Sequence, residues 1–458
     1  MKPLWQLGAG ALHAGFAARE FTPEDALASC LERSRACQGA VNPFIALDDG
    51  AAREAAAAST ARWQRGEPLG PLDGVPVSLK DNLHARGWPT SWGSRLLAAT
   101  PQGADEAPVA RLRSGGAVIF GKTNLPEFAL QGITESEVGG VTRNPWDLSR
   151  TPGGSSGGAA AAVASGCGPL ALTTDGGGST RRPASHCGVV GFKPSAGLVR
   201  RGGGLPEIYG DHEVPGVIAR DVQDAAHAMQ VLAPAFALSR NEKPARILYV
   251  PRFGAHRVDT GISAEVGAAA QRLASLGHTV EVSAPVQWAE TVNELWPAYS
   301  ARGLARLFDQ RVEHGDLGDL DEQKVCEATR ASLKLGREAQ GIRHIADAAI
   351  RELRERMALV FRDYDAILTP ATAALPWPVG RSHPATIDGH AAGPRGHAVF
   401  TAFANAAGLC AIAVPAGFVH GLPCGFQLVA AQGNDAGLIA LALAYEQAFP
   451  RAAEWPTP

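Results

Sequence analysis

Apolar residues along this chain follow two patterns: helical spacing in the longer segments, and short unbroken runs of four or five residues. The first pattern predicts helices at 51–63, 106–114, 158–165, 222–232, 262–276, 398–407 and 436–449. The second predicts strands at 75–79, 117–120, 170–174, 247–250, 279–282, 366–369, 411–414 and 425–429. Strands that alternate with helices indicate an α/β fold whose sheet is mostly parallel or mixed.

Two further parts of the chain are expected to be helical. A Thr-Pro-Glu-Asp sequence at 22–25 is a typical helix start near the N-terminus, and 288–360 is charged and mostly helical in pattern. No repeat or low-complexity linker divides the chain, so we expect one domain, 1–458. Its expected parts are an N-terminal helical part (1–68), a region with the candidate chemistry (71–220), and a helical elaboration (about 236–395) that shapes the substrate site.

Composition and charge narrow the class of protein. The 458 residues are 45% hydrophobic and 19% charged, which is typical of a globular chain with a large core. A net charge of −3 gives no support for a nucleic-acid partner or an anionic membrane surface. The seven cysteines include no Cys-x-x-Cys pair, the N-terminus lacks a signal-peptide pattern, and no apolar run is long enough to span a membrane. We therefore expect a protein of the reducing cytoplasm.

One motif matches a nucleotide-binding pattern in its letters only. Residues 116–123 fit the phosphate-loop pattern G-x4-G-K-[ST], with Lys122 at the lysine position. A phosphate loop needs flexible residues between its glycines and a helix that begins at the lysine. The intervening residues here are Ala-Val-Ile-Phe, which is a strand pattern, so we reject nucleotide binding.

The candidate chemistry centres on two serines that lie among glycines. Ser155 belongs to Gly-Gly-Ser-Ser-Gly-Gly at 153–158, and Ser179 follows Asp-Gly-Gly-Gly at 175–178. Glycine-rich loops allow several backbone N–H groups to converge on one ligand atom, which favours Ser179 as the nucleophile. The predicted oxyanion hole consists of the N–H groups of Gly176, Gly177, Gly178 and Ser179.

A serine hydroxyl is a weak nucleophile until a base removes its proton. Lys80 ends an apolar strand pattern, so its amine is expected to lie in a dry site. Desolvation lowers the pKa of a lysine and leaves it neutral and basic, as in the Ser-Lys variants of serine catalysis. Asp175 and Arg181 flank the second serine loop and are expected to pair and support its shape.

Two other nucleophile arrangements fit the residues less well. The letters at 153–157 match G-x-S-x-G, but no strand pattern precedes them, as a nucleophile elbow requires. Cys187 follows His186 directly, and sequence neighbours seldom face each other usefully, so we expect Cys187 to be a packed side chain.

A set of six motifs occurs in order between residues 71 and 194. They are Pro-Leu-Asp-Gly-Val-Pro-Val-Ser-Leu-Lys-Asp at 71–81, Gly-Lys-Thr-Asn-Leu-Pro-Glu-Phe at 121–128, Thr-Arg-Asn-Pro-Trp-Asp at 142–147, the first serine motif at 153–158, Asp-Gly-Gly-Gly-Ser-Thr-Arg-Arg-Pro at 175–183, and Gly-Val-Val-Gly-Phe-Lys-Pro at 188–194. Weaker matches follow at 364–370, 405–408 and 421–428. Together they resemble the amidase signature family of serine hydrolases.

The resemblance implies a central mixed, largely parallel β-sheet flanked by helices on both faces. It implies a Ser–cis-Ser–Lys triad, in which Ser179 matches the nucleophile, Ser155 the bridging serine with a cis peptide bond, and Lys80 the base. The implied reaction is amide hydrolysis through a serine acyl-enzyme, which releases a carboxylate and an amine or ammonia without a cofactor or a metal. The implied partners are a small-molecule amide and, in a homodimer, a second copy of the chain.

The sequence departs from the family pattern at a few positions, and none is a triad member. Thr180 stands where a branched aliphatic residue is usual, Gly176 where a larger residue is common, and Cys410 where proline is common. Trp92 replaces a small residue, which makes it a candidate for the substrate pocket. Two competing functions stay open: a glutamine-dependent amidotransferase component for tRNA-bound Glu or Asp, and an inactive binding protein on the same fold.

Overall fold

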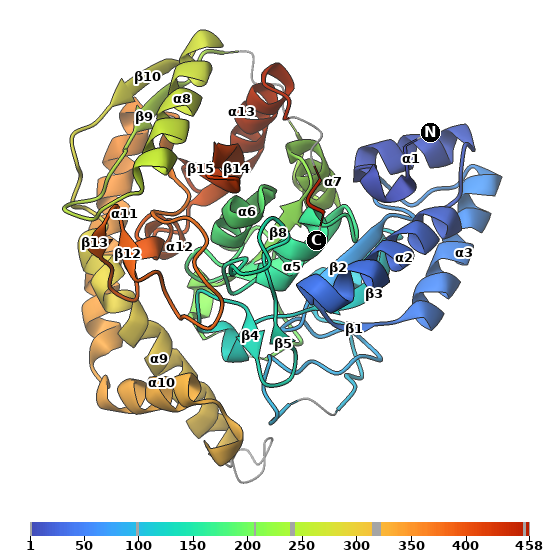
Figure 1. Ribbon diagram of the computed structural model, residues 1–458, viewed down its shortest axis with the longest axis horizontal. Helices are drawn as coiled ribbons and strands as arrows, with labels where there is room; N and C mark the ends of the chain where they lie inside the picture. The colour runs from blue at the N-terminus through green and yellow to red at the C-terminus, as the bar shows by residue number, and fades with distance from the viewer. Residues whose placement is uncertain are drawn as a thin grey trace.

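A single eleven-stranded sheet forms the centre of the molecule (Figure 1). The computed structural model describes residues 2–97, 100–205, 208–238, 243–313, 322–451 and 455–457, without the side chains of 311–313 and 322. In spatial order the strands are β1 (Phe44–Leu47), β3 (Val118–Thr123), β2 (Pro76–Lys80), β6 (Leu170–Asp175), β8 (Val214–Ala219), β7 (Val190–Lys193), β14 (Cys410–Val419), β15 (Leu422–Ala430), β11 (Ala366–Pro370), β9 (Arg246–Tyr249) and β10 (Thr279–Val282). Two small hairpins lie apart from it: β4 (Glu135–Ser136) with β5 (Gly140–Val141), and β12 (Thr386–Ile387) with β13 (His390–Ala391).

The sheet is mixed, as the sequence predicts, but its parallel pairs are confined to two regions. β3, β2 and β6 are parallel to one another near one end, and β11, β9 and β10 near the other. Between these two regions each neighbouring pair is antiparallel: β6 with β8, β8 with β7, β7 with β14, β14 with β15, and β15 with β11. β1 is also antiparallel to β3. The expectation of a largely parallel sheet is therefore too strong. One reason is a hairpin: β14 and β15 are joined by His420 and Gly421, both with positive φ, as a two-residue hairpin turn requires.

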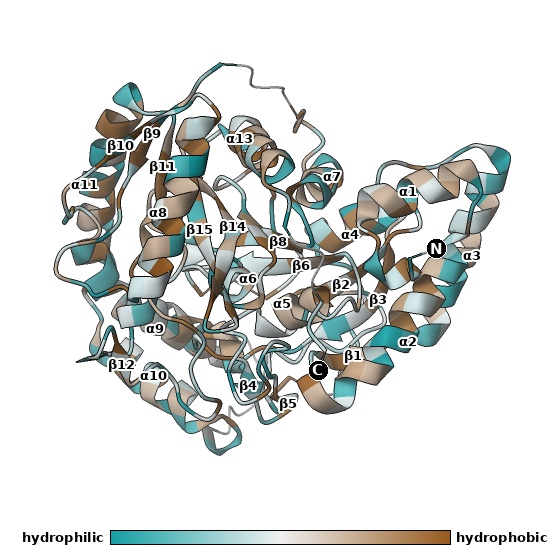
Figure 2. Ribbon diagram, turned by 45° about the horizontal axis from the view of Figure 1, so that its top comes forward, coloured by the Kyte–Doolittle hydropathy of each residue, from teal (hydrophilic) through white to brown (hydrophobic). Residues whose placement is uncertain are grey.

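Helices cover both faces of the sheet, as expected. They are α1 (Ala9–Ala18), α2 (Pro23–Val41), α3 (Asp49–Arg65), α4 (Ala107–Ser114), α5 (Gly157–Ala164), α6 (Arg181–Cys187), α7 (Val222–Leu232), α8 (Thr260–Ser275), α9 (Glu290–Glu313), α10 (Glu327–Glu338), α11 (Ile342–Asp363), α12 (Ala402–Ala406) and α13 (Asp435–Ala448). In Figure 1, α1–α3 lie on one side of the molecule and α9–α11 on the other, with the sheet between them. Figure 2 shows teal, hydrophilic residues gathered on outer helices such as α3 and α11.

Alternating strand residues contact helices on opposite faces. In β6, Ala171 packs with residues of α5 and α6, whereas Leu170 and Leu172 pack in the main core with residues of α7. In β3, Phe120 packs with residues of α2 and α3, whereas Ile119 joins the main core. This period of two is what a sheet covered on both faces requires.

Four short elements near the candidate site are absent from the sequence-based expectations: β1, α6, β7 and β8. Pro215 and Gly216 interrupt the apolar run of β8, and Pro183 lies inside α6. Both residue types normally mark turns, so propensity alone argues against these elements. Pairing of β8 with β6 and β7 overrides that local preference.

The start of α5 packs closely against the backbone at Asn124, and this contact can be used to test the fold. A Cβ at Gly158 would lie 2.5 Å from the backbone N and O atoms of Asn124, neither of which is the end of a flexible side chain. We expect Gly158→Ala to lower the free energy of unfolding by about 1–3 kcal/mol, the usual cost of overpacking. The measurement is thermal unfolding followed by circular dichroism.

The matched control is Gly39→Ala in α2, where no atom lies within 4 Å of the added Cβ. Because glycine in a helix interior loses more backbone entropy than alanine, this change should stabilise by about 0.5–1 kcal/mol. Equal midpoints for the two variants would contradict the packing described for α5.

Candidate active site

The candidate site forms where the carboxyl ends of two parallel strands meet. β2 ends at Lys80 and β6 at Asp175, and the two strands pair in parallel, so these residues lie at the same edge of the sheet. The Lys80 side chain is fully buried there. Its Nζ donates to Ser155 Oγ at 2.7 Å and to Thr174 Oγ1 at 3.3 Å. The Thr174 hydroxyl also accepts from Asn82 Nδ2 at 2.8 Å, which fixes it beside the lysine.

Burial changes the acid–base properties of Lys80. Desolvation lowers its pKa to about 7, against the opposing effect of the Glu213 and Asp175 carboxylates, which favour the charged form. A lysine with this pKa is neutral in about half of the molecules at pH 7. The dry strand end expected from the sequence is therefore present, and the amine can act as a base near neutral pH.

The two serines continue the hydrogen-bonded chain from Lys80. Ser155 Oγ donates to Ser179 Oγ at 3.0 Å, and the Gly154–Ser155 peptide bond is cis. Ser155 is fully buried, whereas Ser179 is partly exposed. The backbone N–H of Ser156 donates to the Ser179 carbonyl at 3.3 Å, which joins the two loops. The structure thus brings all three residues of the expected triad together, with Ser179 nearest to solvent.

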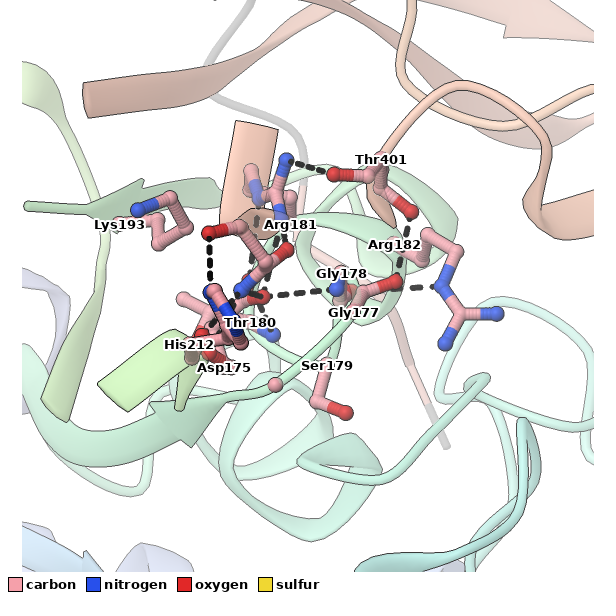
Figure 3. Close-up of polar contacts among 12 residues, drawn as sticks. Asp175, Gly177, Gly178, Ser179, Thr180, Arg181, Arg182, Lys193, His212 and Thr401 are labelled. Carbon is pink, nitrogen blue, oxygen red and sulfur yellow. Dashed lines mark hydrogen bonds and ion pairs between the residues drawn. The ribbon is translucent and has the colours of Figure 1, made fainter. Parts of the chain in front are cut away.

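A buried ion pair organises the loop that carries Ser179. The Asp175 carboxylate accepts from the backbone N–H groups of Gly178 (2.7 Å) and Thr180 (3.1 Å), and from Arg181 Nε (3.0 Å) and Nη2 (2.9 Å). Burial alone would raise the pKa of Asp175, but the charge and hydrogen bonds of Arg181 hold it well below its usual range. Figure 3 shows these contacts gathered around Asp175, beside the loop that carries Ser179. The expected pairing of Asp175 with Arg181 is present, with both side chains fully buried.

Arg181 ties this loop to distant parts of the chain. Besides Asp175, it donates to the Thr401 carbonyl (3.1 Å), to Gln427 Oε1 (2.6 Å) and to Asn405 Oδ1 (2.6 Å). Asn405 in turn donates to the Asp175 carbonyl at 2.8 Å. Neither Asn405 nor Gln427 is among the site residues predicted from the sequence. The only signal for them is that both lie in the weaker motifs at 405–408 and 421–428.

The glycine loop directs its N–H groups to different sides. The carbonyls of Gly176 and Gly177 accept from Trp296 Nε1 (3.0 Å) and Thr401 Oγ1 (2.7 Å), and the Gly178 carbonyl accepts from the Arg182 N–H (2.9 Å). In a trans peptide the next N–H points away from the carbonyl, so the N–H groups of Gly177 and Ser179 face away from those partners.

The Gly178 N–H is the exception to the expected oxyanion hole, because it donates to Asp175. Among the described residues, the N–H groups of Gly176, Gly177 and Ser179 donate to no other group. The sequence-based prediction of four donors is therefore too broad by one. The local reason is the backbone conformation of Gly178, whose φ of +108° turns its N–H toward the Asp175 carboxylate.

Two departures from the family pattern have packing reasons. A Cβ at Gly176 would lie 2.6 Å from Cδ2 of Tyr209, so the aromatic ring occupies the space that a larger residue would need. Thr180 uses its hydroxyl, which lies 2.8 Å from that of Thr173 on β6. The glycine at 176 therefore accommodates Tyr209, and the threonine at 180 adds a hydrogen bond to the sheet.

Trp92 is fully buried, with φ of +52°. Its ring packs beside Phe128, with ring centroids 6.4 Å apart, in a hydrophobic cluster that includes Leu205 and Phe308. Its role in the substrate pocket stays a prediction.

The rejected motifs have structural roles. Lys122 lies within β3, pairs with Asp81 at 2.9 Å and donates to the Leu83 carbonyl at 2.7 Å, so its ammonium is fully engaged away from any phosphate loop. Cys187 is fully buried, and burial raises the pKa of its thiol, so it stays protonated. His186 directs Nε2 to the Ala374 carbonyl at 3.1 Å, not to Cys187.

In the part of the chain that the structure describes, no group of three or more His, Cys, Asp or Glu side chains is arranged to hold a metal ion. None of the described helices is both long and apolar enough to cross a membrane.

The chain matches known proteins over most of its length. The family model named Amidase matches residues 25–439. A glutamyl-tRNA(Gln) amidotransferase subunit of Symbiobacterium thermophilum is 35% identical, over 96% of both chains. The same subunit of Chloroflexus aggregans is 34% identical, over 100% of this chain and 98% of the relative.

Several solved structures with the same fold are of amidases and hydrolases rather than amidotransferase subunits. A bacterial aryl acylamidase of the amidase signature family aligns with a TM-score of 0.87 at 28% identity, over 98% of this chain and 97% of the other. The 6-aminohexanoate cyclic dimer hydrolase aligns with a TM-score of 0.87 at 29% identity, over 99% of both chains. The peptide amidase of Stenotrophomonas maltophilia gives 0.79 at 28% identity, over 98% of both.

The buried ion pair gives a testable expectation. We expect Asp175→Asn to lower the free energy of unfolding by about 3–5 kcal/mol, because it leaves the buried Arg181 guanidinium without a counter-charge. Urea unfolding of the purified protein measures the change. The control is Glu67→Gln, which removes the partner of Arg65 in an exposed pair and should change stability by less than about 0.5 kcal/mol. Similar losses in both variants would contradict the role given to the buried pair.

Proposed function

The chain belongs to the amidase signature family of enzymes that act on carbon–nitrogen bonds, and from this premise we propose that it hydrolyses linear amides through a Ser179 acyl-enzyme. The observation that carries the proposal is the continuous chain from Lys80 Nζ to Ser155 Oγ (2.7 Å) and on to Ser179 Oγ (3.0 Å). A base, a relay and a nucleophile at hydrogen-bond distance are what serine-based acyl transfer requires.

The acylation step uses the same three groups with the donors reversed, so that protons move from Ser179 to Ser155 and from Ser155 to neutral Lys80. Neutral Lys80 takes the proton of Ser155, which takes the proton of Ser179 as its Oγ attacks the amide carbonyl. The carbonyl oxygen becomes an oxyanion, which the N–H groups of Gly176, Gly177 and Ser179 stabilise by donated hydrogen bonds. Ser155 then gives its proton to the nitrogen and takes one back from Lys80, which becomes neutral again, and the C–N bond breaks as an amine or ammonia leaves.

Deacylation uses the same groups. A water molecule gives its proton through Ser155 to Lys80 and attacks the ester carbon, and Ser179 regains its proton as the carboxylate leaves. The substrate is a small-molecule amide, and each step uses groups that one chain supplies. The proposal includes the homodimer and the cytoplasmic location expected from the sequence. All seven cysteines are free thiols, which is consistent with a reducing compartment.

A second candidate function is that of an amidotransferase component, which passes ammonia to a partner protein. The glutamyl-tRNA(Gln) amidotransferase relatives favour it. The stretch at 125–128 and the lack of an acidic side chain at 398–401 favour the free amidase instead. The structural neighbours named for amidase activity point the same way.

Purified protein assayed alone against a panel of aliphatic and aryl amides separates these functions. We expect hydrolysis without added glutamine or a partner protein, and a loss of about 10⁴-fold or more in Ser179→Ala, because the nucleophile is removed. Ammonia or amine release measures turnover. Turnover that appears only with a partner would favour the amidotransferase, and a wild type as inactive as Ser179→Ala would indicate an inactive binding protein.

The pKa of Lys80 sets the expected pH dependence. Only the neutral amine accepts a proton, and its pKa is about 7, so kcat/KM for an uncharged amide should rise with pH through 7 and level off above 8. At pH 6 the value should be about a tenth of the plateau. Lys80→Ala should lose the activity while it keeps its circular dichroism spectrum. A flat profile between pH 6 and 8 would contradict the assignment of Lys80 as the base.

A further inference from the structure

Two arginines beside the loop that carries Ser179 have no acidic partner in the part of the chain that the structure describes. Arg182 follows Arg181 at the start of α6, and Arg395 lies in the loop before α12. The two positive charges are close enough to affect each other. The pKa of Arg182 is lowered to about 9, mainly by burial and secondly by the charge of Arg395. Neither forms an ion pair with a carboxylate among the described residues. Arg182 is buried, and Arg395 is half-buried with its Nη2 atom covered. Buried cationic groups are normally paired, so these two neighbours need an explanation.

Arg181 and Arg182 differ sharply in their contacts although they are adjacent. Figure 3 shows Arg181 held among the polar groups around Asp175, while Arg182 extends away from that carboxylate. The partners of Arg182 are neutral: the Gly178 carbonyl (3.4 Å), the Gly154 carbonyl (3.4 Å) and His397 Nε2 (2.9 Å). Gly154 and Gly178 directly precede the two catalytic serine candidates in the chain, so the guanidinium lies at the site itself.

Arg395 supplies a second cationic group with unused hydrogen-bond capacity. Its Nη2 is buried and has no described hydrogen-bond partner. Burial raises the pKa of Tyr209, whose ring packs over Gly176, and the nearby Arg395 charge opposes that rise. The acids that act on this region, Asp175 and Glu213, are already engaged by Arg181 and Arg201. An incoming anion would therefore meet no competing carboxylate from these residues.

His397 adds a neutral donor to the same group. Burial and the neighbouring arginine charges hold its pKa well below the usual range, so the ring is neutral. Since Arg182 donates to Nε2, the ring proton lies on Nδ1, which is buried without a described partner. A donor with no acceptor inside a protein is costly, and a ligand oxygen would satisfy it.

We propose that Arg182 and Arg395 bind a carboxylate of the substrate, so that the enzyme prefers amides of small acids in which the carboxylate lies a few atoms from the scissile carbonyl. This inference rests on the proposed amide hydrolysis. Guanidinium groups match the planar, two-oxygen geometry of a carboxylate, which neutralises their charge. An α-ammonium group beside two arginines is unfavourable, so a simple acid amide should be a better substrate than free glutamine.

The kinetic test compares succinamate with butyramide, which has the same amide and a methyl group in place of the carboxylate. We expect kcat/KM for succinamate to exceed that for butyramide by about 10- to 100-fold, the range of a charge-assisted contact. Arg395→Gln should reduce this ratio by a similar factor, mainly through a higher KM for succinamate, and Arg395→Lys should keep part of it. The matched control is Arg381→Gln, an exposed arginine in the same part of the chain, which should leave both substrates unaffected.

A binding measurement separates this inference from the proposed function. Calorimetry with Ser179→Ala should detect succinamate, and Ser179→Ala with Arg395→Gln should bind it about tenfold or more weakly. Equal hydrolysis of succinamate and butyramide, unchanged in Arg395→Gln, would overturn the inference while amide hydrolysis stands. Arg395-dependent binding of succinamate without hydrolysis of any amide would overturn the proposed function and support the carboxylate site.

Discussion

The buried pair of Asp175 and Arg181 is the interaction on which the candidate site depends. The Asp175 carboxylate accepts hydrogen bonds from the N–H groups of Gly178 and Thr180, on either side of Ser179, so it fixes the curve of the loop that carries Ser179. The Arg181 guanidinium contacts the other parts of the chain that meet here, from Thr401 to Gln427. A buried ion pair contributes little net stability, but either charge alone would be very costly. The observed shape of the loop therefore depends on both charges.

The site contains two contrasting electrostatic environments that lie close together in space: one with paired charges and one with unpaired charges. Asp175 and Arg181 neutralise each other's charge, whereas Lys80 has hydroxyl groups as its nearest partners and a pKa lowered to about 7. Arg182 lies on the other side of the loop among neutral acceptors. Charge is thus neutralised where the backbone must be rigid, and left unpaired where proton transfer and ligand recognition are proposed.

Much of this arrangement can be predicted from the sequence, because the motif residues lie at the ends of strands with clear apolar patterns. Lys80 and Ser179 follow such strands, and parallel pairing of β2 with β6 then brings them to one edge. The antiparallel centre of the sheet is harder to predict, since β8 contains Pro215 and Gly216 and depends on its neighbours. Gln427 lies in one of the weaker motifs, but no local pattern reveals its contact with Arg181, and the bond between the Gly178 N–H and Asp175 follows from loop geometry.

The contacts of Arg181 also bear on the order in which the chain is made. A ribosome adds Lys80, Ser155 and Ser179 early, but 246 residues separate Arg181 from its partner Gln427 on β15. The hairpin of β14 and β15, which lies beside β7 in the middle of the sheet, is also among the last parts to emerge. Until it does, the loop lacks the groups that hold its charged residue in place. A nascent chain therefore carries the three candidate catalytic side chains for most of its synthesis without the framework that aligns them.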